Sequence, residues 1–183
     1  MVRAALVKSI FEQCVQRGVK QIVVISAGFR ETGKEGAILE EELVHYARQQ
    51  GIHFVGPNGM GIVSTRINLT AVMWPVQGLK PGGLTFISQS GNIGTIGITV
   101  ASQRGIGLNA YISVGNMADL QMEDYIEFFG KHDPQTKVLA CYVEGVKDGR
   151  RFAKLVREVS RIKSVILLKA GRSTAGQKAA RSH

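Results

Sequence analysis

Hydrophobic and polar positions along this chain alternate between two spacings, one typical of helices and one typical of buried strands. Apolar positions from Leu6 to Val15 follow helical spacing, and residues 21–27 form a short run rich in β-branched side chains. Residues 37–50 return to a helical pattern with three glutamates near its N-terminal end, and residues 53–55 form a second short strand. The pattern therefore predicts two strands that alternate with two helices.

The alternation resumes after an interruption at residues 62–82, which show no clear helical face and contain turn-like Pro and Gly pairs. Beyond it the pattern predicts strands at 84–88, 108–114, 137–143 and 165–169, and helices at 92–104, 121–131 and 149–162. Strands that alternate with helices of about ten to fifteen residues predict βαβ units and a parallel sheet. We therefore expect an α/β fold with a domain boundary near residue 79.

Both units that this boundary defines look incomplete. Residues 1–78 hold about two strands and two helices, which is half of a doubly wound domain. Residues 79–183 hold four predicted strands and end without a closing element. We therefore expect the chain to be a fragment of a longer polypeptide.

Composition narrows the class of protein further. The chain has 183 residues, of which 44% are hydrophobic and 20% charged, and this balance excludes a disordered polyampholyte. Its two cysteines, Cys14 and Cys141, make no disulfide framework, so we expect a reducing, cytoplasmic compartment. No apolar run approaches the roughly 20 residues of a membrane span, and we expect no membrane association.

The net charge of +9 suggests a nucleic-acid-binding surface until it is divided by position. Residues 137–183 hold twelve Lys and Arg against three Asp and Glu, so the whole excess lies in this segment. The segment has few aromatic side chains, and the basic residues of 149–162 fall on the solvated face of an amphipathic helix. We therefore expect no nucleic-acid partner.

A loop rich in Ser and Gly joins a predicted strand directly to a predicted helix at residues 87–94. Ser90 is suited to cap the helix, and Gly91 allows the backbone to turn tightly into it. Free N–H groups at such a terminus form an anion site, to which Ser88 and Ser90 add hydroxyl groups. The same features fit a plain capped turn, so the residues alone leave phosphate or carboxylate binding open.

Further candidates follow other predicted strands, at the edge where ligands of open α/β sheets bind. Asn58 is suited to donate to a ligand carbonyl or phosphate, and equally to hold its own turn. Asn116 has the same two interpretations, and Asp119 in the same loop is suited to cap the next helix. Glu144 ends a strand, where a carboxylate can orient a catalytic base or simply form a cap or an ion pair. No spacing of Cys and His predicts a metal site.

Taken together, these motifs resemble the ADP-forming (NDP-forming) acyl-CoA synthetases of the succinyl-CoA synthetase superfamily. In order, the motifs are Gly56-Pro-Asn-Gly-Met-Gly61, Gly83–Gly94, Ser113–Asp119, Tyr142-Val-Glu-Gly145 and Lys169–His183. The resemblance is to the α-subunit portion and covers essentially the whole chain. It implies the later half of a Rossmann-like CoA-binding domain at residues 1–78, followed by a flavodoxin-like, doubly wound parallel-sheet domain at 79–183.

The resemblance also implies a reaction. The family interconverts acyl-CoA, phosphate and ADP with free acid, CoA and ATP, through an acyl phosphate and a phosphohistidine. Ser182-His183 matches the first half of the family's Ser-His-Thr-Gly segment, which makes His183 the phosphorylated residue and Glu144 the carboxylate that orients it. The matching motifs imply that the phosphoryl group is held by Ser88, Ser90, Gly91 and Asn92, and the CoA or acyl group by Asn58, Gly115 and Asn116.

In this family an ATP-grasp β subunit or later domain receives the phosphoryl group, and Mg²⁺ is expected there. The sequence lacks that part and the Gly-rich nucleotide turn of the CoA-binding domain, so we expect the chain to be inactive alone and to act within a homo- or hetero-oligomer. The acyl group and the nucleotide stay open. The alternative is a non-catalytic acyl-CoA-sensing or scaffold module of a fusion protein. Such relatives tend to lose the histidine, so His183 favours catalysis.

Overall fold

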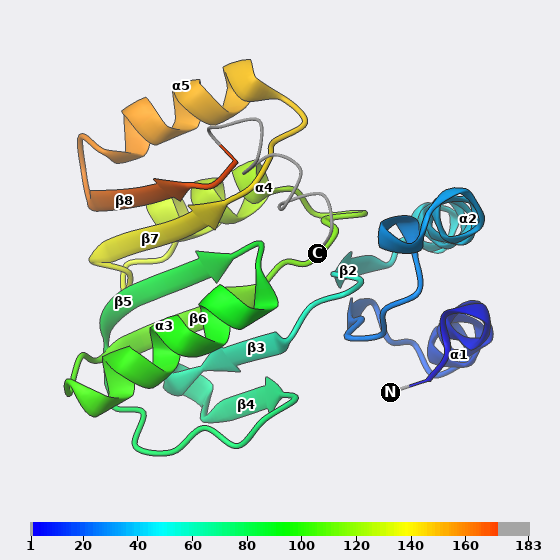
Figure 1. The fold of residues 1–183 in the computed structure, drawn as a ribbon, viewed down its shortest axis with the longest axis horizontal. Coiled ribbons are helices and arrows are strands. Elements are labelled where there is room, and N and C mark those ends of the chain that lie inside the picture. The colour runs from blue at the N-terminus through cyan, green and yellow to red at the C-terminus, as the bar shows by residue number, and fades with distance from the viewer. Residues whose placement is uncertain (1, 172–183) are drawn as a thin grey trace.

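The computed structural model describes residues 2–171, which build two α/β units side by side (Figure 1). The first unit comprises helices α1 (Ala4–Gln16) and α2 (Lys34–Gln49) and a parallel pair of strands, β1 (Gln21–Val23) and β2 (His53–Val55). Its core joins both helices to the strands, and Phe11 of α1 meets Phe54 of β2 edge to face at a centroid distance of 5.4 Å. The strand predicted at 21–27 is therefore confirmed, but it is shorter than predicted.

The second unit is a six-stranded sheet with the strand order β4-β3-β6-β5-β7-β8. Its strands are β3 (Gly61–Ser64), β4 (Leu69–Val72), β5 (Pro81–Ser88), β6 (Leu108–Ser113), β7 (Val138–Val143) and β8 (Ser164–Lys169). The last four run parallel to one another, whereas β3 is antiparallel to both β4 and β6. The parallel strands thus follow the order of a flavodoxin-like sheet, in which the first strand lies between the second and the third.

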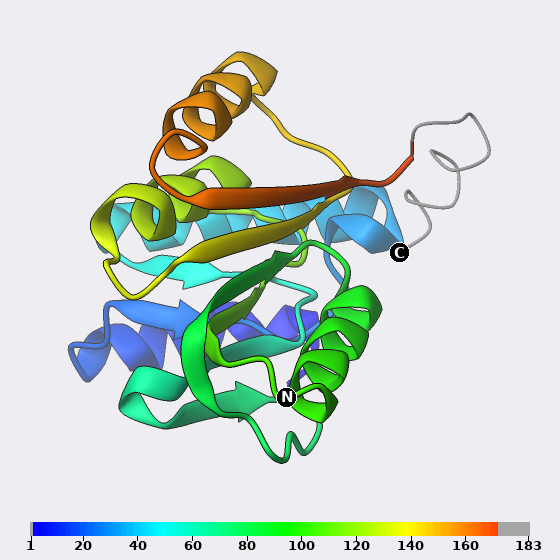
Figure 2. The same cartoon turned by 90° about the vertical axis from the view of Figure 1, so that its left-hand side faces the viewer.

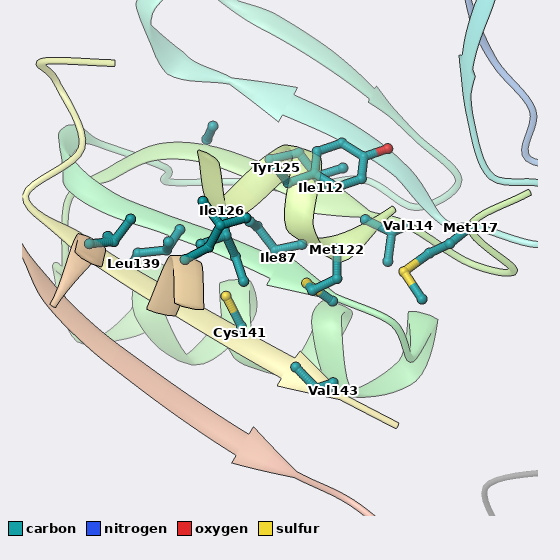
Figure 3. Close-up of a cluster of buried hydrophobic side chains, with 13 residues drawn as sticks. Ile87, Ile112, Val114, Met117, Met122, Tyr125, Ile126, Leu139, Cys141 and Val143 are labelled. Carbon is teal, nitrogen blue, oxygen red and sulfur yellow. The ribbon is translucent and has the colours of Figure 1, made fainter. Parts of the chain in front are cut away.

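Helices cover both faces of this sheet (Figure 2). The helices are α3 (Gly91–Gln103), α4 (Met122–Glu127) and α5 (Gly149–Val159), and a π-helical turn, Phe128–His132, follows α4. Successive side chains of a strand point to opposite faces, so Tyr111 of β6 packs beside Ile98 of α3 while the next residue, Ile112, packs on the face of α4 and α5. Figure 3 shows the latter face, where Ile87 and Cys141 of adjacent strands lie beside α4.

Strand β5 marks the point at which the order of the sheet reverses. The chain passes from β5 through α3 to β6, and then crosses back through α4 to β7 on the other side of β5. The loops after β5 and β7 therefore diverge, and such a switch point is where open α/β sheets bind ligands. In Figure 1 the arrowheads of β5, β7 and β8 point toward the side on which the first unit lies.

The predicted α/β class with a flavodoxin-like parallel sheet is confirmed. The interruption predicted at residues 62–82 is wrong in its first half, because β3 and β4 form a hairpin there that extends the second sheet. Both strands are only four residues long, and Asn68 between them takes a left-handed φ of +52°. Neither strand is therefore long enough to show a repeated alternation of apolar and polar residues. The boundary near residue 79 stays a prediction, although hydrogen bonds of the second sheet reach residues that precede it.

Candidate functional site

A cleft of about 670 Å³ opens at the switch point, between the two units. One wall consists of the loops after β5 and β7, with Gln89, Ser90, Gly91 and Asn92 opposite Glu144–Lys147. The other wall consists of loops from the first unit and the loop after β6, with Arg30, Glu31, Asn58, Gly115 and Asn116. The structure therefore brings most of the sequence-predicted residues to one place.

The N-terminus of α3 has the geometry of an anion site. Ser90 caps the helix, and its hydroxyl accepts from the N–H of Ile93 at 3.4 Å. The N–H groups of Gly91 and Asn92 donate to no acceptor within residues 2–171, and both residues line the cleft. These free donors and the helix dipole behind them favour an oxyanion at this point.

Ser88 does not reach the cleft. Its side chain is fully buried, and its hydroxyl donates to the carbonyl oxygen of Ser90 at 2.6 Å. Ser88 thus shapes the turn into α3, and the hydroxyl group predicted to contact a phosphoryl group at this position is already used.

Two glycines bring α3 close to the sheet. A Cβ atom at Gly94 would overlap the ring and hydroxyl of Tyr111, and one at Gly97 would overlap the ring of Phe86. The side-chain-free face of α3 therefore sits directly on large aromatic residues, which fixes the position of its N-terminus.

Glu144 follows β7 on the same wall of the cleft as this terminus. Its N–H and that of Gly145 both donate to the side-chain oxygen of Gln89, at 2.8 and 3.1 Å, and its carbonyl accepts from Lys169 at 2.7 Å. Burial, and then the negative charge of Glu144, raise the pKa of the neighbouring Tyr142. Gln89 thus ties the two loops of the switch point together. Sequence reasoning missed this residue, although it stands between the two serines of the loop.

The opposite wall is joined by side-chain hydrogen bonds. The amide of Asn58 donates to Asn116 at 3.3 Å, and the amide of Asn116 donates to Glu31 at 2.6 Å and to Glu40 at 2.8 Å. A Cβ at Gly115 would overlap the backbone of Pro57 and Asn58, so only glycine allows these two loops to approach so closely. The Asn58 side chain therefore bonds across to the second unit and does not hold its own turn.

Two carboxylates of this wall were not predicted as site residues. Glu40 is fully buried and forms a short ion pair with Nε of Arg30, besides its bond to Asn116. Burial raises the pKa of Glu31, but hydrogen bonds from Asn116 and from the backbone of Gly28 and Phe29 outweigh burial and lower it overall. The sequence signal was weak, because Glu40 is one of three consecutive glutamates of which it alone is buried.

Asp119 does not cap the helix that follows its loop, which was the role suggested by the sequence. Its carboxylate accepts from the N–H of Phe54 and from His53, both at 3.1 Å, and so joins the loop after β6 to β2. At the start of α4 the carboxylate of Asp124 instead accepts from the backbone N–H of Gln121 at 2.7 Å. The prediction of a helix cap at Asp119 is therefore wrong.

Some sequence-predicted features fall outside the structure or its site. His183 lies outside the described residues, as do Arg172, Lys178 and Arg181 near it. Within residues 2–171 no group of three or more His, Cys, Asp or Glu is placed to hold a metal ion. Over the same range no helix is both long and apolar enough to cross a membrane.

Comparisons with known proteins give the cleft a family context. Residues 81–183 match a protein family described as the succinyl-CoA ligase like flavodoxin domain. The α subunit of ADP-forming acetate–CoA ligase I from Pyrococcus furiosus is 47% identical over 185 residues, which cover 100% of this chain and 39% of that subunit. ADP-forming acetate–CoA ligase I from Archaeoglobus fulgidus is 42% identical over 183 residues, which cover 100% of this chain and 26% of that protein.

A solved structure agrees with these sequence matches. Dinucleotide forming acetyl-coenzyme A synthetase 1 from Ca. Korarchaeum cryptofilum, in complex with phosphate and ADP, superposes with a TM-score of 0.91 at 39% sequence identity. The superposition covers 100% of this chain and 39% of that chain. The chain thus spans 39% or less of the length of these relatives. The resemblance drawn from the motifs is confirmed, and the chain belongs to the succinyl-CoA-ligase-like flavodoxin domain family, with ADP-forming acyl-CoA synthetases as its relatives.

Proposed function

We propose that this chain is the α portion of an ADP-forming acyl-CoA synthetase, which interconverts acyl-CoA, phosphate and ADP with free acid, CoA and ATP. The observation that carries the proposal is the cleft at the switch point, where the N-terminus of α3 faces Glu144. The acetate–CoA ligases to which the chain is similar support an acid–CoA ligase reaction.

The α3 terminus is suited to the first step. Phosphate held by the N–H groups of Gly91 and Asn92 attacks the acyl carbon of the thioester, the C–S bond breaks, and CoA leaves as the thiol. The product is an acyl phosphate, whose charge the same donors and the helix dipole stabilise. Asn58, Gly115 and Asn116 line the opposite wall, where they are suited to bind the acyl group and the CoA thiol end.

His183 and Glu144 perform the second step in this proposal. A nitrogen lone pair of the neutral imidazole forms an N–P bond as the acyl carboxylate leaves, and Glu144 accepts a hydrogen bond from the other ring nitrogen. This bond fixes the tautomer of the histidine and stabilises the positive charge that develops on its ring. Phosphoryl transfer of this kind depends mainly on positioning and charge stabilisation.

The reaction also requires an ATP-grasp partner. An ATP-grasp subunit or domain, with Mg²⁺, would pass the phosphoryl group between His183 and ADP. Lys169, Arg172, Lys178 and Arg181 would attract the histidine segment to anionic ligands. We therefore expect an oligomer with this partner in the cytoplasm, and no turnover from the chain alone in a coupled synthetase assay. Turnover above background would contradict that expectation.

The phosphohistidine is tested with the isolated chain and acetyl phosphate that carries a labelled phosphoryl group. We expect acid-labile, base-stable label, which mass spectrometry locates at His183. His183→Asn should abolish the label, whereas His132→Asn, exposed and outside both hollows, should retain it. Failure to label the wild-type chain, with acetyl phosphate and with labelled ATP plus an ATP-grasp subunit, would contradict the proposal and favour the acyl-CoA-sensing module.

A further inference from the structure

A second, smaller hollow of about 340 Å³ adjoins the cleft. One face of α2 lines it, with Glu41, His45 and Arg48 at positions that share a helix face. Arg30 and Lys147 line both hollows and therefore stand on the wall between them. We call this hollow the side pocket.

The side pocket is strongly cationic. Arg30, Arg48 and Lys147 contribute three positive charges, and among residues 2–171 Glu41 is the one carboxylate on the lining, with the buried Glu40 behind Arg30. Partial burial lowers the pKa of Lys147, and the charges of Arg30 and Arg48 lower it further, against the opposing effects of Glu40 and Glu123. The three cations therefore repel one another, and a bound anion would relieve this repulsion.

Hydrogen bonds to other residues hold two of these cations, Arg30 and Lys147, in position. The buried carboxylate of Glu40 pairs with Nε of Arg30, and the terminal NH₂ groups of Arg30 have no acceptor within residues 2–171. The ammonium of Lys147 donates to the carbonyl of Met117 at 3.2 Å, which leaves two of its three hydrogens for another acceptor. Guanidinium groups fixed in this way offer parallel N–H donors that match the oxygens of a phosphate.

From this arrangement we propose that Arg30, Arg48 and Lys147 form a phosphate-binding site in the side pocket, distinct from the α3 terminus. The ligand is a dianionic phosphate group, either free or carried by an organic molecule that extends from the cleft. Positive charge exceeds negative charge at the side pocket even with Arg30 paired to the buried Glu40, and this excess favours an anionic ligand. Because Arg30 and Lys147 face both hollows, an organic ligand of this kind would pass between them.

The site is tested by titrating inorganic phosphate into the full chain while following backbone amide signals by NMR at low ionic strength. We expect saturable shifts near Arg48 and Ala118 in the side pocket, separate from shifts at Gly91 and Asn92. Arg48→Gln should weaken the side-pocket response at least fivefold and leave the α3 response unchanged. Arg157→Gln, an exposed arginine on α5, is the matched control and should change neither response.

Parallel titrations with pantetheine and 4′-phosphopantetheine distinguish the two sources of the phosphate group. Tighter binding of the phosphorylated compound than of inorganic phosphate at the side pocket would assign an organic ligand, and equal or weaker binding would assign free phosphate. Shifts confined to α3, or an equal loss in Arg48→Gln and Arg157→Gln, would overturn the proposal. Neither result depends on the reaction proposed above, because the α3 amides report separately.

Discussion

The two walls of the cleft are built in different ways. The wall formed by α3 and the loop after β7 presents backbone N–H groups, whose positions follow from the helix and from glycines packed on the sheet. The wall formed by the first unit and the loop after β6 presents side chains, held by hydrogen bonds among Asn58, Asn116, Glu31 and Glu40. Backbone packing therefore holds the first wall, whereas side-chain hydrogen bonds to Glu31 and Glu40 hold the second.

This difference predicts how substitutions in each wall lower the stability of the chain. Changes on the backbone wall act through shape, because glycines packed on the sheet fix the α3 terminus. Changes on the side-chain wall act through unsatisfied buried polar groups, whose cost depends on protonation. Substitutions in the two walls should therefore lower stability for different reasons.

Glu40→Ala should cause the largest loss, because it removes the buried acceptor of both Arg30 and Asn116. Breaking a buried ion pair costs about 3–5 kcal/mol, and we expect about 3 because water can reach Arg30. Urea unfolding followed by circular dichroism measures the free energy of unfolding. The matched control is Glu41→Ala, exposed on the same helix, which should change stability by less than about 0.5 kcal/mol. Equal losses in the two variants would show that the side-chain wall is not held by its buried charge.

Gly94→Ala tests the backbone wall. The added methyl group collides with Tyr111, whose ring is fully buried and cannot move aside. Overpacking of this kind costs about 2 kcal/mol. Gly149→Ala in α5 meets no atom within 4 Å and should leave stability nearly unchanged. Because the Tyr111 hydroxyl is the nearest atom, Tyr111→Phe should recover part of the loss, and a double variant no more stable than Gly94→Ala would contradict the steric explanation.

Gln89→Leu should have a smaller effect on the same wall. It removes the acceptor of two N–H groups, those of Glu144 and Gly145, and each such bond contributes about 1 kcal/mol. Because water can replace part of this contribution, we expect a loss of about 1 kcal/mol in urea unfolding. Hydrogen exchange of the two amides should accelerate. Gln103→Leu, exposed near the end of α3, is the control, and unchanged exchange in Gln89→Leu would rule out the tie between the two loops.

Glu31 gives the side-chain wall a pH dependence. Its pKa in the folded chain lies below the ordinary value of 4.5, so its contribution to stability is complete above pH 4.5 and is lost as the pH falls through the lower, folded pKa. Urea midpoints measured from pH 7 down to this acid range should therefore fall less steeply in Glu31→Gln than in the wild type. Glu35→Gln, an exposed change nearby, should follow the wild type. Parallel acid profiles for Glu31→Gln and the wild type would contradict this contribution.

The sequence predicts the backbone wall better than the side-chain wall, and the reason is distance along the chain. Ser90 and Gly91 carry their information locally, because a cap and a tight turn involve residues three or four apart. Asn116 instead meets Glu40 and Glu31 across 76 and 85 residues, and Gln89 meets the N–H of Glu144 across 55. Nothing in a local pattern specifies such pairs.

The wrong predictions for the fold have a similar cause. Helices of ten or more residues repeat their spacing often enough to be recognised, and each was found near its observed place. The hairpin of β3 and β4 is too short for a repeated pattern, and its pairing with β6 depends on residues far along the chain. The role of Asp119 was misjudged for a similar reason, since its acceptor oxygen serves a strand 65 residues away.

In the proposed function, the switch-point cleft transfers a phosphoryl group to His183 with the help of Glu144. The most direct measurement is the rate at which labelled acetyl phosphate phosphorylates the chain, compared between the wild type, Glu144→Gln and the exposed control Glu42→Gln. We predict that Glu144→Gln slows labelling about 100-fold, and that Glu42→Gln labels at the wild-type rate. Labelling of Glu144→Gln at the wild-type rate would contradict the claim.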